Sequence, residues 1–366
     1  MKKRTRVNHP PQVEVPADNR ALVAPIYQTV KFEFDDLDET MRFLQGGRPG
    51  FFYSRTSNPT TRQLELTLAE LQGREECLTT ASGIAAVSQT LISLTKQGDH
   101  ILCFVETYNP TRNVIRRLLS RFGVTFTMLS IEDVAGIERV LTTQPTRLAR
   151  AKGALTVLDN TFAGLHQHGE FDVDVFVHSL TKYASGAGDV MGGAVIAKAE
   201  LIRQMRHDFG SMGGALDPHA AFLIQRGLKT YFLRYSAQCA SALRVAELLA
   251  GHVAVERVRY PGLPAHPQHA LAKAQMKEFG TVVTFDLKGG LEAGKRFCEA
   301  LELFAMAASL GSGESLVMAP QMMRNRELTP EQQKAAAVGE GTVRLSIGLE
   351  DIEDLLEDVS QALGKV

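Results

Sequence analysis

Lys182 follows an apolar run and is surrounded by hydroxyl side chains. Residues 178–193 read HSLTKYASGAGDVMGG, with Ser179 and Thr181 just before the lysine and several glycines after it. A lysine that is removed from water releases its proton more easily, because desolvation disfavours the charged form. The free amine can then form a Schiff base with an aldehyde. Most lysines lie on a solvated surface, so Lys182 alone does not predict this chemistry.

Pyridoxal phosphate (PLP) is the common aldehyde cofactor, and the sequence offers the further groups that it needs. A carboxylate must pair with the pyridine nitrogen, and Asp159 ends the apolar run ALTVLDN, where a carboxylate is out of place without a partner. Phosphate donors are needed, and Ser82 and Gly83 precede an alanine-rich helical start whose first N–H groups suit a phosphate. Tyr108, after the run ILCFVE, is a candidate cover for the ring.

Each of these residues also has a simpler interpretation. Asp159 is equally typical of a cap or turn, the Ser82–Gly83 pair of a strand-to-helix turn, and Tyr108 of a packed loop aromatic. Their occurrence together, in order along one alternating pattern of strands and helices, favours the cofactor site.

That alternating pattern predicts the fold class. The apolar runs with strand character are residues 101–106, 124–129, 154–160 and 173–179. The helical patterns among them are residues 60–71, 111–122 and 131–141. Such alternation predicts an α/β fold with a mostly parallel sheet and helices on both faces. Ligands collect at the carboxyl ends of such strands, which is where Asp159 and Lys182 lie.

The chain divides into three expected parts. Residues 1–50 form an N-terminal arm, because proline, glycine and charge break any period there. Residues 51–235 form the larger domain that carries the candidate site. Residues 236–366 form a smaller C-terminal α/β domain, with strands at 281–287 and 341–349. A long helical stretch follows Asp217 and leads into it.

Composition argues against several other classes of protein. The 40 basic and 41 acidic residues leave a net charge of −1, which gives no reason to expect a nucleic acid or a membrane surface as partner. No run of about 18 apolar residues appears, and no apolar segment follows the basic N-terminus. The four cysteines form no C-x-x-C pair, which favours buried thiols, no metal site and a reducing, cytoplasmic compartment.

Several of these stretches together resemble the Cys/Met-metabolism family of PLP-dependent enzymes, which includes cystathionine synthases, cystathionine lyases and methionine γ-lyases. The matching stretches are FYSRTSNPTTRQLE (52–65), ASGIAAV (81–87), LDNTF (158–162), HSLTKY (178–183), RGLKT (226–230), YPGL (260–263), SLGSGESL (309–316) and VRLSIGLED (343–351). They extend from the arm to the C-terminal helix. The resemblance implies the type I, aminotransferase-like fold with PLP as cofactor.

The resemblance also implies a role for each candidate residue. Lys182 would carry the Schiff base and then move protons, and Asp159 would keep the pyridine nitrogen protonated. The residues implied at the cofactor's phosphate and ring are Gly83, Ile84, Ser179, Thr181 and Tyr108, the last of which would also act in catalysis. Those implied at the substrate carboxylate are Arg344 and Ser309. Tyr53 and Arg55 would reach a neighbouring subunit's cofactor, which implies a homodimer or homotetramer with shared sites.

The activity implied is a trans-sulfuration-type lyase that eliminates a β- or γ-substituent from cystathionine or a related sulfur-containing or γ-substituted amino acid. Two alternatives remain open. One is a cystathionine γ-synthase-type replacement on an activated homoserine, for which the same residues serve. The other is a non-catalytic relative that keeps the fold without the activity.

Four departures from the family pattern bear on these alternatives. Relatives carry an additional strand and an Asn-containing loop between Ser130 and Gly153, and this chain lacks them near residues 146–147. Residues 186–189 read GAGD where relatives usually have Gly-His-Ser-Asp. Asn109 follows Tyr108 where methionine γ-lyases place a reactive cysteine, which disfavours that activity. Ala308 stands where many γ-acting members have an acid.

Overall fold

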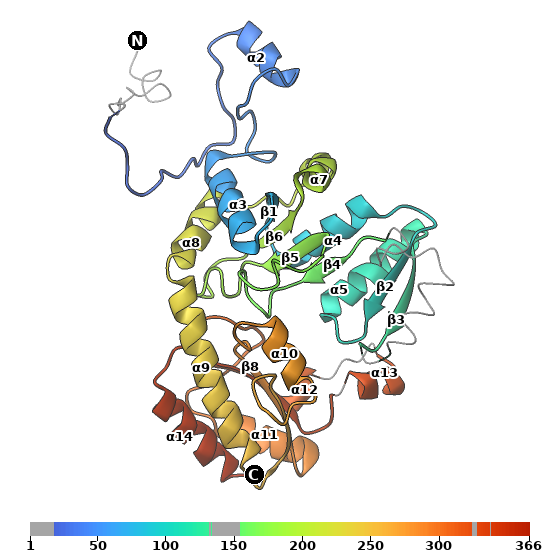
Figure 1. Ribbon diagram of the computed structural model, residues 1–366, viewed down its shortest axis with the longest axis vertical. Helices are drawn as coiled ribbons and strands as arrows, with labels where there is room; N and C mark the ends of the chain where they lie inside the picture. The colour runs from blue at the N-terminus through green and yellow to red at the C-terminus, as the bar shows by residue number, and fades with distance from the viewer. Residues whose placement is uncertain (1–17, 132, 134–153, 324–327, 337) are drawn as a thin grey trace, which may run out of the picture.

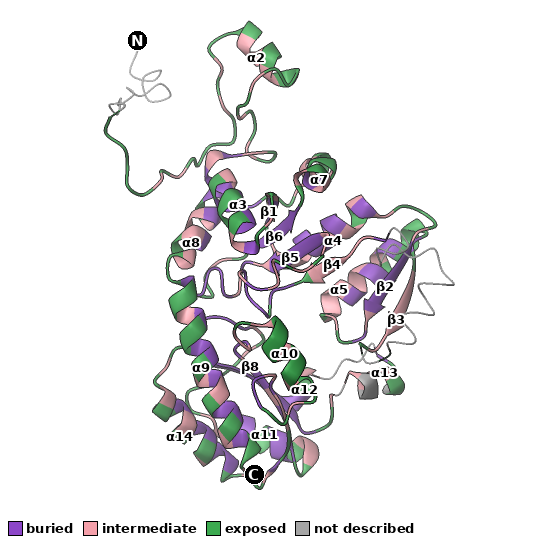
Figure 2. Cartoon of the chain, viewed as in Figure 1, coloured by how far each residue is buried: buried purple, intermediate pink, exposed green. Residues whose placement is uncertain are grey.

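The computed structural model describes residues 18–131, 133, 154–323, 328–336 and 338–366. An extended arm with the short helix α2 (Leu37–Leu44) projects from the body, and its tip lies far from the C-terminus (Figure 1). Helix α2 was not expected; the Asp36 side chain caps it by accepting a hydrogen bond from the Glu39 N–H. Most of the arm is exposed or half-buried (Figure 2), so the part of the expected arm that the structure describes packs little against its own body.

The larger domain contains a four-stranded sheet in the order β1 (Glu76–Thr80), β6 (Gly193–Ala197), β5 (Val175–Ser179), β4 (Val157–Asp159). Beside it lies a parallel pair, β2 (His100–Phe104) and β3 (Thr125–Leu129). The α/β class is therefore confirmed. The expected parallel pairing occurs in β2–β3 and β4–β5, whereas β6 runs antiparallel to both of its neighbours. The reason is that a loop without a helix leads from β5 to β6, and parallel pairing needs a long crossover.

No strand in the described part of the chain pairs with both β2 and β4, so the two groups of strands remain separate sheets. The sequence predicted that one family strand is missing near residues 146–147, and this position lies outside the described residues. Of the helix predicted over 131–141, only residues 131 and 133 are described.

Helices cover both faces of the four-stranded sheet. On one face, Leu64 and Leu68 of α3 (Pro59–Gln72) pack against Phe176 and Ile196. On the other face, α4 (Gly83–Leu94) and α7 (Ala199–Met212) pack against the alternate strand residues, such as Val177. Strands β5 and β6 are consequently buried almost throughout (Figure 2). The predicted helix over 111–122 is α5 (Asn109–Asn113) continued by a π-helical turn (Val114–Leu118) and a 3₁₀ turn (Leu119–Phe122).

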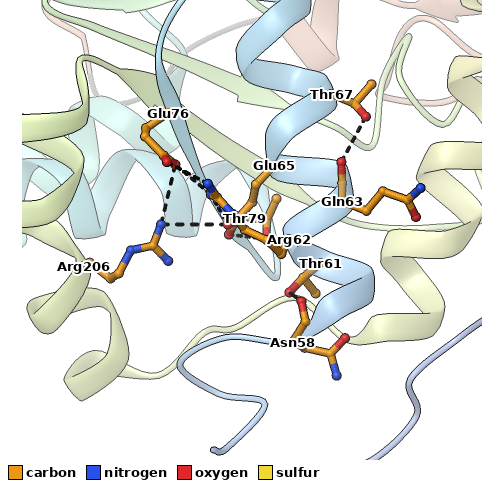
Figure 3. Close-up of polar contacts among 9 residues, drawn as sticks. All are labelled: Asn58, Thr61, Arg62, Gln63, Glu65, Thr67, Glu76, Thr79 and Arg206. Atoms are coloured by element: carbon orange, nitrogen blue, oxygen red, sulfur yellow. Dashed lines mark hydrogen bonds and ion pairs between the residues drawn. The ribbon is translucent and has the colours of Figure 1, made fainter. Parts of the chain in front are cut away.

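An ion-pair cluster joins α3, β1 and α7. The Arg62 guanidinium donates to both oxygens of Glu76 at 2.6 and 2.7 Å, a bidentate geometry that lowers the pKa of Glu76. Glu65 is buried beside them, and Arg206 of α7 approaches Glu65 and Glu76 at 3.9 and 3.8 Å (Figure 3). The cluster fixes the helix and the strand that precede the Ser82–Gly83 turn.

The second sheet has the order β7 (Val255–Arg259), β8 (Val282–Leu287), β11 (Thr342–Ser346), β10 (Leu316–Met318), β9 (Ala305–Met306), and only β9–β10 is parallel. The helices of this half are α10 (His269–Gln275), α11 (Gly290–Ala300), α12 (Pro320–Met323), α13 (Pro330–Ala335) and α14 (Ile352–Leu363). The long helical stretch expected after Asp217 is two helices, α8 (Pro218–Leu228) and α9 (Tyr231–Ala250).

Helix α9 runs along both halves of the molecule (Figure 1). Its first turns, with Tyr231 and Tyr235, belong to the core of the larger half, and its later turns, with Ala242 and Leu249, belong to the core of the smaller half. The proposed domain boundary at residue 236 falls inside this helix.

Three further observations concern the described residues only. None of the helices combines the length and the apolar character needed to cross a bilayer. No group of three or more histidine, cysteine or carboxylate side chains is placed to hold a metal ion. All four cysteines are buried and free of disulfides.

Candidate active site

Lys182 lies just beyond β5, at the carboxyl end predicted for it. Its Nζ donates a hydrogen bond to Ser309 Oγ at 2.8 Å, which brings the two halves of the molecule together at this point. Burial, assisted by the nearby Arg344 guanidinium, lowers the pKa of Lys182. The amine is therefore easier to deprotonate than that of an ordinary surface lysine.

Arg344 projects from β11 of the smaller half, and its Nη2 donates to the Ser309 backbone oxygen at 3.0 Å. Its buried Nε has no hydrogen-bond partner among the described residues, so part of the guanidinium fork is available to an anion. A carboxylate matches that planar fork. The structure thus brings Lys182, Ser309 and Arg344 together.

Asp159 is the last residue of β4 and lies opposite Val177 of β5. Its Oδ1 accepts hydrogen bonds from the Thr161 N–H at 3.1 Å and from the Thr161 hydroxyl at 2.6 Å. Solvent reaches the carboxylate through a cleft, yet the protein around it raises the pKa of Asp159. The main cause is desolvation, and no charged partner is found among the described residues, so a cationic group placed there would be favoured.

The N-terminus of α4 has free donors beside β5. Ser82 caps the helix, with its Oγ accepting from the Ala85 N–H at 3.2 Å, which leaves the Gly83 and Ile84 N–H groups without a partner among the described residues. A Cβ added at Gly83 would lie 2.7 Å from the Ser179 Cβ, so only glycine allows this close approach. The unpaired N–H groups and the Ser179 hydroxyl, close together, suit an anion such as a phosphate.

Thr181 and Tyr108 occupy different surroundings. The Thr181 hydroxyl accepts a hydrogen bond from the Gly192 N–H at 3.1 Å, so it also holds the glycine-rich loop in place. Tyr108 lies between β2 and α5, is largely exposed, and lines the same cleft as Asp159 and Phe162. An exposed aromatic ring in that position is free to cover a flat ligand.

Tyr53 and Arg55, just after the arm, are not shown to contact the residues around Lys182. Arg55 lies over the Tyr53 ring at 5.7 Å, and its Nη1 donates to the Gly210 backbone oxygen of α7 at 2.6 Å. The prediction that both serve a neighbouring subunit remains a prediction.

The structure adds a residue that sequence reasoning missed. The Thr161 hydroxyl donates to Asp159 and accepts from the Ser179 N–H at 2.9 Å, so one side chain fixes two cofactor-site residues. The Asp-x-Thr spacing in LDNTF, typical of an Asx turn, was a usable signal for it. The buried bond of 2.6 Å between His178 Nε2 and Gln72 Oε1 had no such signal, because 106 residues separate the two.

The residues present fit PLP, which no part of the structure contains. The unpaired N–H donors suit the phosphate of that cofactor, and the Asp159 carboxylate suits its pyridine nitrogen. The exposed ring of Tyr108 suits the cofactor ring, and Lys182, with its lowered pKa, suits the aldehyde.

Comparisons with known proteins show the family to which the chain is similar. A family model described as "Cys/Met metabolism PLP-dependent enzyme" matches residues 5–148 and 142–364. The L-methionine γ-lyase of Pseudomonas putida is 40% identical, over 94% of this chain and 92% of that protein. A crystal structure of cystathionine γ-synthase from Xanthomonas oryzae in complex with aminoacrylate and cysteine has a TM-score of 0.87 at 34% identity, covering 94% of this chain and 93% of that one. A cystathionine γ-lyase structure from Micromonospora echinospora has the same TM-score and identity and covers 96% of both chains.

The matches also locate a discontinuity. The family model matches in two stretches that meet at residues 142–148. The alignment with the Pseudomonas protein spans 368 positions, whereas 94% of 366 residues is about 344, so about 24 of those positions have no counterpart in this chain.

Proposed function

The chain belongs to the Cys/Met-metabolism family of PLP-dependent enzymes, and on that premise we propose that it is a lyase. The proposed reaction eliminates a sulfur-linked substituent from the γ- or β-carbon of cystathionine or a related amino acid. The contact of Lys182 and Arg344 with the same residue, Ser309, supports PLP-dependent chemistry at the α-carbon, and the likeness to a methionine γ-lyase and a cystathionine γ-lyase favours elimination. The contact with Ser309 places a proton-accepting amine beside a carboxylate clamp.

Each residue then has a physical task. Arg344 and Ser309 bind the substrate carboxylate, which orients the α-carbon toward Lys182. Lys182, whose lowered pKa favours the free amine, removes the α-proton and returns a proton to the departing group. Asp159 holds a positive charge at the pyridine nitrogen. Bound there, PLP supplies an electron-withdrawing ring that stabilises negative charge at the α-carbon.

Ala308 stands where the far end of the substrate would lie, by the family resemblance. Ala308 contributes no charge there, so the sequence does not select a distal ammonium or carboxylate group. Methionine γ-lyase and cystathionine γ-lyase are the activities of two similar proteins described above. We therefore propose acceptance of several γ-substituted substrates, with L-cystathionine as the first to test.

Product analysis tests the lyase proposal. The protein reconstituted with PLP is incubated with L-cystathionine alone, and keto acid and ammonia are measured. Elimination at the γ-carbon releases 2-oxobutyrate and cysteine, whereas elimination at the β-carbon releases pyruvate and homocysteine. We expect γ-elimination. If no keto acid forms under conditions where PLP is bound, the lyase proposal is wrong.

The second candidate is replacement at the γ-carbon, which the likeness to the Xanthomonas cystathionine γ-synthase favours. In that reaction the holoenzyme consumes O-succinyl- or O-acetyl-homoserine only when cysteine is added, and cystathionine accumulates without ammonia. The same incubations with and without cysteine therefore separate the two candidates.

We also propose that the active unit is a homodimer, within a homotetramer, in which Tyr53 and Arg55 complete the neighbour's phosphate site. The arm and the residues just after it support this, because they expose apolar side chains, including Leu22, Tyr27 and Phe52, that the rest of the described chain does not cover. A cytoplasmic location is proposed from the four free, buried cysteines.

Hybrid subunits test the shared site. Arg55→Ala and Lys182→Ala proteins should each be nearly inactive. Once subunits exchange, a mixed dimer has one site free of both substitutions, so mixing should restore up to about a quarter of normal activity, since half of the dimers are mixed. Mass spectrometry of differently tagged subunits establishes the exchange. Mixed dimers without restored activity would show that Arg55 serves its own subunit's site.

A further inference from the structure

Tyr183, the residue after Lys182, is buried where the two halves of the molecule meet. It is only 2% exposed, and its ring packs edge-on against Tyr235 with the ring centroids 4.9 Å apart. Its hydroxyl shares a hydrogen bond of 2.8 Å with the hydroxyl of Thr281, which is fully buried in the smaller half. Lys182 bonds to Ser309 of the same half. Two consecutive residues of the larger half therefore each make a side-chain hydrogen bond to the smaller half.

Thr281 is fastened to the strand that carries Arg344. It directly precedes β8, and its backbone oxygen accepts a hydrogen bond from the Ile347 N–H at 2.9 Å. In the same sheet, β8 pairs with β11 so that Thr284 lies opposite Arg344. Because buried, hydrogen-bonded strands keep their register, a displacement of Thr281 would displace Arg344 with it.

The segment that carries Ser309 also lies against Tyr183. Gly311 has a φ of 78°, and a Cβ added there would lie 2.8 Å from both the backbone nitrogen and the ring Cδ1 of Tyr183. Only glycine allows this approach, because the backbone conformation and the lack of space both exclude a side chain. The Gly311 N–H also donates to Ser346 Oγ of β11 at 3.4 Å. Tyr183 is thus connected to both parts of the carboxylate clamp: to the Ser309 segment directly, and to β11 through Thr281.

The Tyr183 hydroxyl is suited to holding a position rather than to moving protons. Burial raises its pKa, so the hydroxyl stays protonated at pH 7. Lys182 must change its own partner when it binds the cofactor or accepts a proton, so its bond to Ser309 cannot persist unchanged. The bond between Tyr183 and Thr281 involves no reacting atom, and it can therefore remain intact throughout turnover.

We propose that Tyr183 and Thr281 are a pair of positioning residues, whose shared hydrogen bond fixes the distance between Lys182 and the carboxylate clamp formed by Ser309 and Arg344. A substrate carboxylate bound by the clamp then presents its α-carbon to Lys182 at one distance. This role rests on the proposed chemistry at Lys182, but not on which substituent departs.

Steady-state kinetics of the holoenzyme with L-cystathionine test this role. Tyr183→Phe and Thr281→Val nearly keep the buried volume, and each removes one hydroxyl of the pair. Each should lower kcat about tenfold and change KM by less than about twofold, because the clamp still binds the carboxylate but holds it less well aligned with Lys182. The double variant should lose no more than either single variant, since all three break the same bond. Thr281→Ser keeps the hydroxyl and should retain kcat.

Tyr260→Phe is the matched control. Tyr260 is a buried tyrosine whose hydroxyl donates to the Gly280 backbone oxygen at 2.9 Å, next to Thr281 but within the smaller half. Thermal unfolding measures how far each substitution destabilises the protein, and we expect only Tyr183→Phe to lose kcat. Equal losses of kcat in the two variants would overturn the proposal, because they would reflect the general loss of a buried hydrogen bond. If Tyr183→Phe does not fold, Thr281→Val and Thr281→Ser decide, and equal kcat values for that pair would overturn it.

The pKa of Lys182 in the cofactor-free protein provides a readout that needs no turnover. It is measured by NMR with isotope-labelled lysine, and the Lys182 signal is identified by its absence in Lys182→Ala. Desolvation, and to a lesser extent the charge of Arg344, lower this pKa. Loosening of the contact in Tyr183→Phe should therefore raise it by about half a unit or more, whereas Tyr260→Phe should not. If the unsubstituted holoenzyme turns over none of the substrates named above, the proposed function fails and this titration decides the positioning role: an unchanged pKa in Tyr183→Phe would overturn it.

Discussion

Lys182→Ala is expected to abolish turnover and the visible absorbance that PLP shows when it is covalently attached to protein. Lys182 is the only lysine that the structure places against Ser309 and Arg344 in the described chain, so no other amine can take over its tasks. Removal of a positioned proton-transfer group alone costs about 10²- to 10⁴-fold in rate. Loss of the covalent attachment adds to that, and we expect a decrease of about a thousandfold or more.

Lys198→Ala is the matched control, because Lys198 is exposed at the start of α7. It should retain both absorbance and activity. Spectra of the reconstituted proteins and initial rates with L-cystathionine measure the two effects. If the unsubstituted protein takes up no PLP at all, the chain is the non-catalytic relative that the sequence left open. If Lys182→Ala retains the attached-cofactor spectrum, another lysine is the anchor.

The sequence predicted the parts of the site that have local signals. Asp159 and Lys182 each lie at the carboxyl end of an expected strand, and the rule that ligands lie at such ends was sufficient to group these two. The Ser82–Gly83 turn was found from the helical start that follows it. Ser309 and Arg344 lie more than 120 residues from Lys182, so no local pattern relates them to it. They were found only through the family resemblance.

Some elements were missed for identifiable reasons. β1 reads ECLTT and β6 reads GAVIA, and neither five-residue run has an alternation or a length that separates it from a loop or a helix end. The strand expected over 154–160 is only three residues long, because only Val157–Asp159 pair with β5 and no other described strand pairs with them. The antiparallel direction of β6 depends on the loop after Lys182, whose glycines gave no indication of its path.

One glycine of that loop illustrates why its structure was unpredictable. Gly186 has a φ of 69°, and a Cβ there would lie 1.9 Å from Arg234 Nη1. Arg234 itself donates to the Tyr183 and Gly227 backbone oxygens at 2.9 Å. The glycine is required by a side chain 48 positions away, which is a tertiary constraint rather than a local one.

The second large effect is expected for Asp159→Asn. The amide keeps an oxygen that can accept both hydrogen bonds from Thr161, so the local turn is preserved. The negative charge is lost, and with it the stabilisation of a protonated pyridine nitrogen. The bound cofactor would cover this pair of opposite charges, and breaking a covered pair costs about 3–5 kcal/mol, which corresponds to a decrease in rate of between about 10²- and 10⁴-fold.

Asp174→Asn is the control, because Asp174 makes the same kind of contact at the other end of the same strand pair. Its Oδ2 accepts from the Thr156 N–H and hydroxyl, both at 2.8 Å. Steady-state rates of the two holoenzymes should therefore differ by at least about a hundredfold. Equal losses of activity would mean that Asp159 acts only by supporting the backbone turn.

Stability measurements separate the charge effect from damage to the fold. The protein around Asp159 desolvates the carboxylate and raises its folded-state pKa, so the unfolded state holds the ionised form more readily. A raised carboxyl pKa contributes stability only at low pH, and that contribution is lost as the pH rises through the folded-state pKa. At pH 7 the ionised carboxylate therefore destabilises the cofactor-free protein. Asp159→Asn should leave the free energy of unfolding of that form unchanged or higher, while it lowers the activity of the holoenzyme. A variant that loses activity and stability together would contradict an electrostatic role for Asp159 at the cofactor.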